Sequence, residues 1–415
     1  MDSTLEKIIS FYLDSRDFNG LPIRSTEEID LTATEGLVRR DLVQVVDESD
    51  YLNPHIRPWK SRRTIDDQIE SLRNLDSDEH FVCLYPTVTA MAGYDLGDRY
   101  KGLPYDGKMA EGHGTLELAF FKFEVLEPYR NDPRFVFRLG DYGVDIWLND
   151  DLYMDESEPE MDKIAINHVG FAYDLSKFDK DNPDSEIKRL VCAFNVDLRK
   201  LNSVHQLRWS TYEIEKTPDI SPHLIWWRQQ MGHWPDGLGP FERFFYELET
   251  LNALFERAHG DVLLNAISRP NGFGWIVRPS RSEYDAFVHQ LDKLLSENLR
   301  HKALDLLGVE KKNKNGEQLG TLNRLELALR RFGVDEAKAK AALRPLRDVR
   351  RLRQKPAHSL TSNVTNSSFI HHQASLLREV TESIESLRRF WQTNPSNADW
   401  DEPDYAAIES NRYWL

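Results

Sequence analysis

The chain has 415 residues, more than one hydrophobic core usually organises, and its 40% hydrophobic and 29% charged residues are typical of a globular protein, so two or three domains are expected. A formal net charge of −16 argues against a surface that is basic throughout, and no apolar run of 18 residues predicts a membrane span. The start lacks a secretory signal pattern, and two cysteines are too few for a disulfide framework or a four-cysteine zinc site. We therefore expect a cytoplasmic protein that contacts no membrane and needs no metal or cofactor.

The first part of the chain, residues 1–105, is expected to be a mixed α/β segment. Residues 5–13 have helical spacing, and Gly20 and Pro22 provide stop signals behind them. A second helical stretch leads into an apolar run at 41–46, which predicts a strand.

Residues 106–220 change character and predict a β-rich, largely antiparallel domain. Their short alternating runs are separated by Gly, Pro and Asp, the punctuation expected between antiparallel strands. The acid-rich stretch 149–162 lacks the spacing of an EF-hand and is expected to be a solvated loop. The predicted strands are 115–127, 134–139, 144–150, 187–198 and 205–215.

The remainder of the chain has helical periodicity. Residues 221–279 are expected to form a helical connector, residues 280–393 a bundle of four helices joined by short loops, and residues 394–415 an acidic, aromatic tail. The fold class expected is α+β, with a mixed or antiparallel β-rich N-terminal region before an all-α bundle. The helices predicted for the bundle are 282–307, 321–332, 335–354 with an interruption near Pro345, and 369–392.

The sequence contains one partial match to a familiar catalytic motif. There is no phosphate-binding glycine loop, no HExxH, no GxSxG and no CxxC. Glu186 and Lys188 form an ExK triplet at the start of a predicted strand, and Asp145 lies in an earlier strand. Restriction-type nucleases use such residues on adjacent strands to hold Mg²⁺, so a magnesium-dependent nuclease is one alternative function.

A predicted helix that is rich in arginine supports a stronger hypothesis. The segment LRPLRDVRRLRQKPAHS, residues 343–359, ends with Arg353 followed five residues later by His358. A histidine titrates near neutrality and can transfer protons, while a guanidinium can neutralise charge that develops on a phosphate. RNA supplies its own nucleophile, the 2′-hydroxyl, so this pair suits phosphodiester cleavage without a metal. The neighbouring side chains expected to bind RNA are Arg347, Arg350, Arg351, Gln354 and Lys355, and Glu326 on the preceding helix is a possible polar partner of the Arg–His pair.

This motif at the end of a helix in a C-terminal four-helix bundle resembles the HEPN superfamily, whose active members are metal-independent RNases of toxin and anti-phage systems. The resemblance covers roughly residues 280–392, with Arg353, Gln354 and His358 matching the R-polar-x-x-x-H pattern; asparagine, aspartate or histidine is commoner than glutamine in that polar position. It implies a catalytic pair of Arg353 and His358, an RNA substrate, and a homodimer in which two motifs face each other. It also implies that the N-terminal region senses a trigger or holds the nuclease inactive, with a regulatory or antitoxin protein as a further possible partner.

Two alternatives remain open for this region. The bundle could be a catalytically silent HEPN-like module for dimerisation or nucleotide binding, or an unrelated helical domain. A second pair with the same spacing, Arg228 and His233, lies among tryptophan and glycine residues without a basic helix, and is interpreted as coincidental.

The net charge is unevenly distributed. Residues 1–277 carry −20, residues 278–392 carry +8, and the tail from residue 393 carries −4. The acidic total therefore does not exclude nucleic acid, because the predicted bundle is basic.

Overall fold

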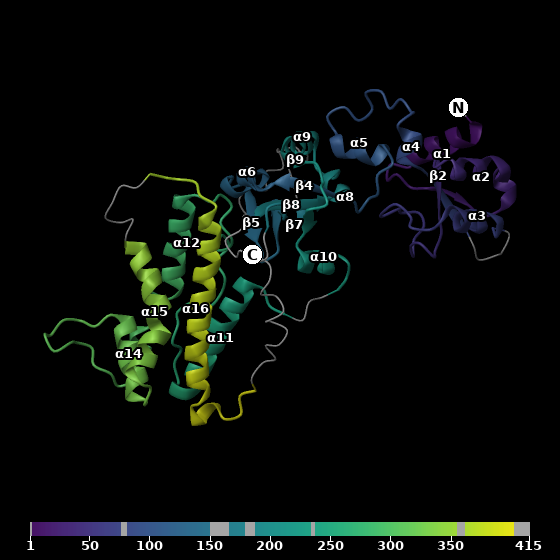
Figure 1. Ribbon diagram of the computed structural model, residues 1–415. Coiled ribbons are helices and arrows are strands. Elements are labelled where there is room, and N and C mark those ends of the chain that lie inside the picture. The colour runs from purple at the N-terminus through teal and green to yellow at the C-terminus, as the bar shows by residue number, and fades with distance from the viewer. Residues whose placement is uncertain are drawn as a thin grey trace.

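The computed structural model describes residues 2–75, 81–149, 166–178, 187–233, 237–354 and 362–401. The molecule has an α/β unit at one end, a sheet in the middle and a helical region at the other end (Figure 1). The expected α+β class is confirmed, with antiparallel sheets followed by helices.

The N-terminal unit is built on a three-stranded antiparallel sheet in the order β1-β3-β2. Most of its helices begin at polar caps: Asp2, Asp30 and Thr64 each accept a hydrogen bond from a backbone N–H of the first turn that follows. The apolar faces of these helices and the three valines of β2 are buried in one core. The elements are α1 (Ser3–Asp14), β1 (Leu21–Ile23), α2 (Leu31–Arg39), β2 (Val43–Val46), α3 (Ile65–Arg73), β3 (Val82–Pro86), α4 (Val88–Met91) and α5 (Pro104–Ala110).

The central sheet is antiparallel, in the order β5-β6-β7-β8-β4-β9, with β10 paired to the end of β7 that extends beyond β6. One face is covered by α10, whose Trp226 lies against Gly170; a Cβ atom at Gly170 would lie 2.3 Å from the indole, so only glycine fits there. The elements are β4 (Leu118–Lys122), α6 (Glu127–Asn131), β5 (Phe135–Leu139), β6 (Gly143–Leu148), β7 (Ile166–Asp174), β8 (Lys188–Phe194), α8 (Asn195–Leu198), α9 (Ser203–Tyr212), β9 (Glu213–Ile214), β10 (Ile220–Pro222) and α10 (Leu224–Gln230).

The prediction of a strand over residues 205–215 is wrong for most of its length. The segment is helix α9, and only its last residues pair as β9. Asn202 caps the helix by accepting from the backbone N–H of His205, and the buried His205, Gln206 and Trp209 lie on one helical face.

The helical region contains α11 (Pro240–His259), α12 (Arg281–Leu294), α13 (His301–Leu306), α14 (Thr321–Arg331), α15 (Glu336–Gln354) and α16 (Ser368–Gln392). Helix α11 packs along α16, so this part of the segment expected to be a connector lies against the last helix of the helical region (Figure 1). A buried ion pair, Arg388 Nε to Glu247 Oε2 at 2.8 Å, joins these two helices. One continuous hydrophobic core runs from the central sheet into this region.

The predicted helix 282–307 is interrupted between α12 and α13. The side chain of Asn298 explains the break, because its oxygen accepts from the backbone N–H groups of Asn265 and Ala266, and its amide donates to the Leu294 carbonyl. The chain therefore turns to bind the segment after α11. By contrast, α15 continues through Pro345, where we expected an interruption.

Candidate functional site

Arg353 lies in the last turn of α15 and is held by two carboxylates of the α12–α13 segment. Its Nη1 atom donates to Asp292 Oδ2 at 2.7 Å and also to Glu297 Oε1. The Asp292 side chain is 1% exposed and that of Glu297 is 44% exposed. The hydrogen bonds to these carboxylates raise the pKa of Arg353, and the one from Arg353 lowers the pKa of Glu297. Asp292 is thus a buried anchor, whereas Glu297 is an exposed partner.

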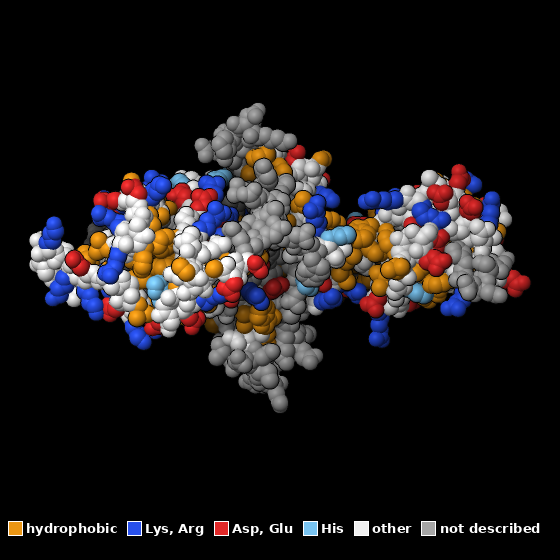
Figure 2. Space-filling model, turned by 90° about the horizontal axis from the view of Figure 1, so that it is seen from below, with side chains coloured by type: hydrophobic (Ala, Val, Ile, Leu, Met, Phe, Trp, Pro, Cys, Tyr) orange, Lys and Arg blue, Asp and Glu red, His pale blue; other side chains and the backbone are white. Residues whose placement is uncertain are grey.

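Most other arginines of α15 also have acidic partners. Arg347 Nη2 lies 2.6 Å from Glu326 Oε2, so Glu326 pairs with Arg347, whereas Arg353, for which we expected it, pairs with other carboxylates. Arg351 lies 3.3 Å from Asp348, which Arg344 also approaches from the other side. In Figure 2, Lys and Arg side chains over the helical region are interspersed with Asp and Glu. The basic character of the helix is therefore partly neutralised within the chain.

Arg350 differs from these neighbours. Its side chain has no acidic partner among the residues that the structure describes, and it lines a cavity of about 580 Å³. Gln354, the last residue of α15, is exposed. Two further residues of the predicted site, Lys355 and His358, lie outside the described residues.

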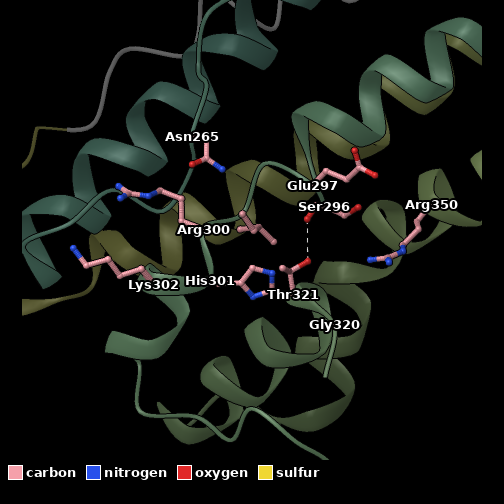
Figure 3. Close-up of a pocket in the computed structure, with 10 residues that line it drawn as sticks. Asn265, Ser296, Glu297, Arg300, His301, Lys302, Gly320, Thr321 and Arg350 are labelled. Carbon is pink, nitrogen blue, oxygen red and sulfur yellow. Dashed lines mark hydrogen bonds between the residues drawn. The ribbon is translucent and has the colours of Figure 1, made fainter. Parts of the chain in front are cut away.

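The cavity lies between the α12–α13 connection, the start of α14 and the end of α15 (Figure 3). Thr321 Oγ1 donates to the Ser296 carbonyl at 2.9 Å and so fixes the start of α14 beside the connection. Glu297 is one of the lining residues, so the partner of Arg353 is also a wall of the cavity. The full lining comprises Asn265, Ser296, Glu297, Leu299, Arg300, His301, Lys302, Gly320, Thr321 and Arg350.

The cationic side chains around the cavity fall into two groups. In Figure 3 the Arg350 guanidinium extends toward the Thr321 and His301 side, whereas Arg300 and Lys302 extend away from it. Arg300 Nη1 lies 2.6 Å and Lys302 Nζ 3.4 Å from the Asp261 carboxylate. Two cations therefore share one anion at the outer rim, which leaves that rim with a positive surplus.

The residues of the metal-nuclease alternative are not brought together. Asp145 lies on β6 beside His168, whose backbone N–H donates to it at 3.4 Å, while Lys188 on β8 pairs with Asp174. Strand β7 lies between β6 and β8. Its residue beside Asp145 and its residue beside Lys188 are six positions apart, which corresponds to roughly 20 Å along the strand. Glu186 lies outside the described residues. Within the described part of the chain, no group of three or more His, Cys, Asp or Glu residues could hold a metal ion.

The second Arg–His pair, Arg228 and His233, forms the C-terminus of helix α10. The backbone N–H of His233 donates to the Arg228 carbonyl at 2.8 Å, and Gly232 between them has a φ of +76° at the end of α10. This is the hydrogen-bonding pattern of a helix C-terminus.

The cavity is a feature that the sequence pattern did not predict. The consecutive triplet Arg300, His301 and Lys302 was the available signal, but it fell inside a helix predicted as continuous, which distributes consecutive side chains around its axis. The break before α13 places all three on the cavity wall.

No protein-family model matches this chain, and no curated protein or solved structure is significantly similar to it. Among the described residues, no helix is both long and apolar enough to cross a membrane.

Proposed function

We propose that the helical C-terminal region is a HEPN-like endoribonuclease that cleaves RNA without a metal ion, with Arg353 and His358 as its catalytic residues. The observation that carries the proposal is the position of Arg353 beside a cationic cavity. Its partner Glu297 forms one wall of that cavity, and Arg350, one turn earlier on α15, forms another.

The chemistry needs two roles from the protein. His358 accepts the proton of the 2′-hydroxyl as that oxygen attacks phosphorus, and Arg353 neutralises the charge that develops on the phosphoryl oxygens. The bond from phosphorus to the 5′ oxygen breaks, the leaving oxygen takes up a proton from water, and His358 returns its own proton to the solvent. The products are a 2′,3′-cyclic phosphate and a 5′-hydroxyl end.

The two partners of Arg353 suit this role differently. Asp292 is buried and would keep the guanidinium oriented throughout the reaction. Glu297 is exposed enough to be displaced, and a phosphate oxygen would take its place on Nη1. A charge-assisted bond to phosphate would then replace one to a carboxylate.

The surrounding residues would bind the RNA backbone. Arg350 and Arg351 are exposed on the last turns of α15, together with Gln354, and Lys355 follows in the chain. Arg347 is turned toward Glu326 and would contribute less. Binding through such contacts should weaken steeply with salt.

The proposal includes the assembly that the HEPN resemblance implies. Two chains would form a homodimer through their helical regions, in the cytoplasm, as a toxin or anti-phage defence effector. The N-terminal unit and the central sheet would sense the trigger or a regulatory partner. The single core shared by the sheet and the bundle supports a mechanical connection between them.

Digestion of labelled RNA by the purified full chain in excess EDTA tests the proposal. We expect cleavage to persist in EDTA and to fall about 10²–10⁴-fold in His358→Ala. Arg344→Gln is the matched control, because Arg344 is 76% exposed on the same basic helix and does not line the cavity. Unchanged activity in His358→Ala would overturn the proposal, and so would loss of the wild-type activity when EDTA is added.

One observation favours a second candidate, a catalytically silent module. Arg353 is already hydrogen-bonded to two carboxylates, and a guanidinium so satisfied has no need of a phosphate. Such a module would serve dimerisation or nucleotide binding and would leave RNA intact both in wild type and in His358→Ala.

A further inference from the structure

The chain enters α12 through residues 274–280, which we call the linking segment, and the central domain (the central sheet and its helices) binds this segment at two points. Arg189 of β8 donates from Nη2 to the Ile276 carbonyl at 2.6 Å. Arg278 donates from Nε to Glu127 at the start of α6 at 2.9 Å, and from Nη2 to the other oxygen of the same carboxylate. The linking segment is therefore attached to both a strand and a helix of the central domain.

Glu283, in the first turn of α12, joins the same three parts of the molecule. Its Oε2 atom accepts from the backbone N–H groups of Val277 and Arg278, at 2.9 and 3.1 Å, and so folds the linking segment onto the helix. The same atom lies 2.6 Å from Nη1 of Arg130 on α6. The two side chains of this ion pair are 29% and 22% exposed. One carboxylate thus fixes the start of α12 to the central domain.

Helix α12 connects this anchorage to Arg353. It lies beside α15, and nine residues separate Glu283 from Asp292 in its last turn, or about 13 Å along the axis (Figure 1). Asp292 is 1% exposed and accepts from Arg353 at 2.7 Å. Because a helix moves as a stiff element, a displacement of its start is transmitted to the carboxylate that orients Arg353.

The linking segment is also bound by the residues that follow the Arg–His motif in the chain. The backbone N–H of Asn366 donates to the Pro279 carbonyl at 2.8 Å, and that of Arg281 donates to the Val364 carbonyl at 2.9 Å. These residues lead into α16, which begins at Ser368. The chain is therefore tied to the linking segment on both sides of the motif, through Arg353 before it and through these backbone bonds after it.

We propose that Arg130 and Glu283 are positioning residues for RNA cleavage, which fix the start of α12 to the central domain and thereby hold Asp292 and Arg353 in place. The inference rests on the proposed function and makes the central domain a working part of the cleavage site. A half-exposed ion pair contributes little to stability. A displacement of about 1 Å at a catalytic group can nevertheless cost about 100-fold in rate, so the pair can matter more for the reaction than for the fold.

Steady-state cleavage of a labelled RNA by the full chain in EDTA tests the positioning role. We expect kcat to fall about tenfold or more in Arg130→Gln and in Glu283→Gln while KM changes less than about twofold, because the arginines that bind the RNA backbone stay on α15. Arg130→Lys should lose less, since a single donor at Nη1 can be replaced by an ammonium. Arg134→Gln is the matched control, because Arg134 pairs with Asp132 in its own loop, and it should keep the wild-type rate.

A second measurement does not depend on cleavage. In protein labelled with ¹⁵N-arginine, the Nε–Hε signal of Arg353 is assigned by its loss in Arg353→Lys. We expect this signal to shift or broaden in Arg130→Gln and to stay in place in Arg134→Gln, while melting curves show that all variants fold.

The two readouts separate the inference from the proposed function. An unchanged kcat together with an unmoved Arg353 signal in both Arg130→Gln and Glu283→Gln would overturn the inference. A wild-type chain that leaves RNA intact, but whose Arg353 signal still responds to Arg130→Gln, would overturn the cleavage proposal and leave the positioning of Arg353 supported.

Discussion

Two arginine–carboxylate clusters in the helical region show how the same chemistry serves different purposes. Arg388 and Glu247 lie 2.8 Å apart between α16 and α11, and both side chains are 0% exposed. Arg353 reaches a buried Asp292 on one side and a half-exposed Glu297 on the other. A fully enclosed pair can only hold helices together, whereas a cluster with one open partner can exchange that partner for a ligand.

The enclosed cluster should give the largest effect on stability. Arg388→Ala removes the guanidinium from a buried carboxylate, so we expect the free energy of unfolding to fall by about 3–5 kcal/mol. Urea denaturation followed by circular dichroism measures it. Arg389→Ala is the control, because Arg389 is 61% exposed in the next position and its loss should change stability by roughly 0.5 kcal/mol or less. Equal effects of the two substitutions would contradict the assignment of Arg388 to the core.

The open cluster should lose more activity than its loss of stability explains, even though Arg353→Gln also takes a partner from the buried Asp292. Arg353→Gln removes the charge that neutralises the phosphoryl oxygens, and cleavage of RNA should fall about 10²–10³-fold. Initial rates on a labelled RNA, compared with unfolding curves of the same variant, separate the two effects. A variant that loses stability in step with activity would indicate a structural role instead.

The exposed carboxylate of Glu297 should compete with RNA for the Arg353 guanidinium. Glu297→Gln weakens its hold on the guanidinium, so RNA affinity should rise about two- to fivefold, the equivalent of an exposed ion pair. Filter binding at fixed salt measures the change, with Glu382→Gln as an exposed acidic control on α16. Reduced affinity in Glu297→Gln would mean that Glu297 positions Arg353 for RNA and does not compete with it.

The smallest expected effect is a pH dependence of stability. The hydrogen bond from Arg353 lowers the pKa of Glu297, so this contact stabilises the fold above the ordinary glutamate pKa of 4.5 and is lost as pH falls through the depressed value. The difference in unfolding free energy between wild type and Glu297→Gln should therefore be present at pH 7 and vanish in acid. A difference that does not shrink as the pH falls below 4.5 would argue against the ion pair.

Much of the fold could be predicted from local patterns. Strands β5 and β6 and the helices ending near 332, 354 and 392 follow from alternation, apolar spacing and stop signals. Residues 205–215 were predicted as a strand from the alternation of polar and apolar residues. That pattern takes no account of Asn202, which caps the helix that actually forms. The break at Asn298 could not be foreseen, because it depends on hydrogen bonds to residues more than 30 positions away.

The candidate site was predictable only in part. The sequence located Arg353 and the basic face around it, since both are local features of one helix. It did not reveal which arginines are neutralised, because Glu326 and Asp292 come from other helices. The cavity was missed for the same reason: its walls come from segments far apart in the chain.

The ends of the RNA fragments made in EDTA test the central claim most directly. Mass spectrometry of the products from wild type and His358→Ala would identify them. Metal-independent attack by the 2′-hydroxyl predicts 2′,3′-cyclic phosphate and 5′-hydroxyl ends, produced by wild type only. Fragments with 5′-phosphate and 3′-hydroxyl ends, or intact RNA after prolonged incubation with wild type, would contradict the account.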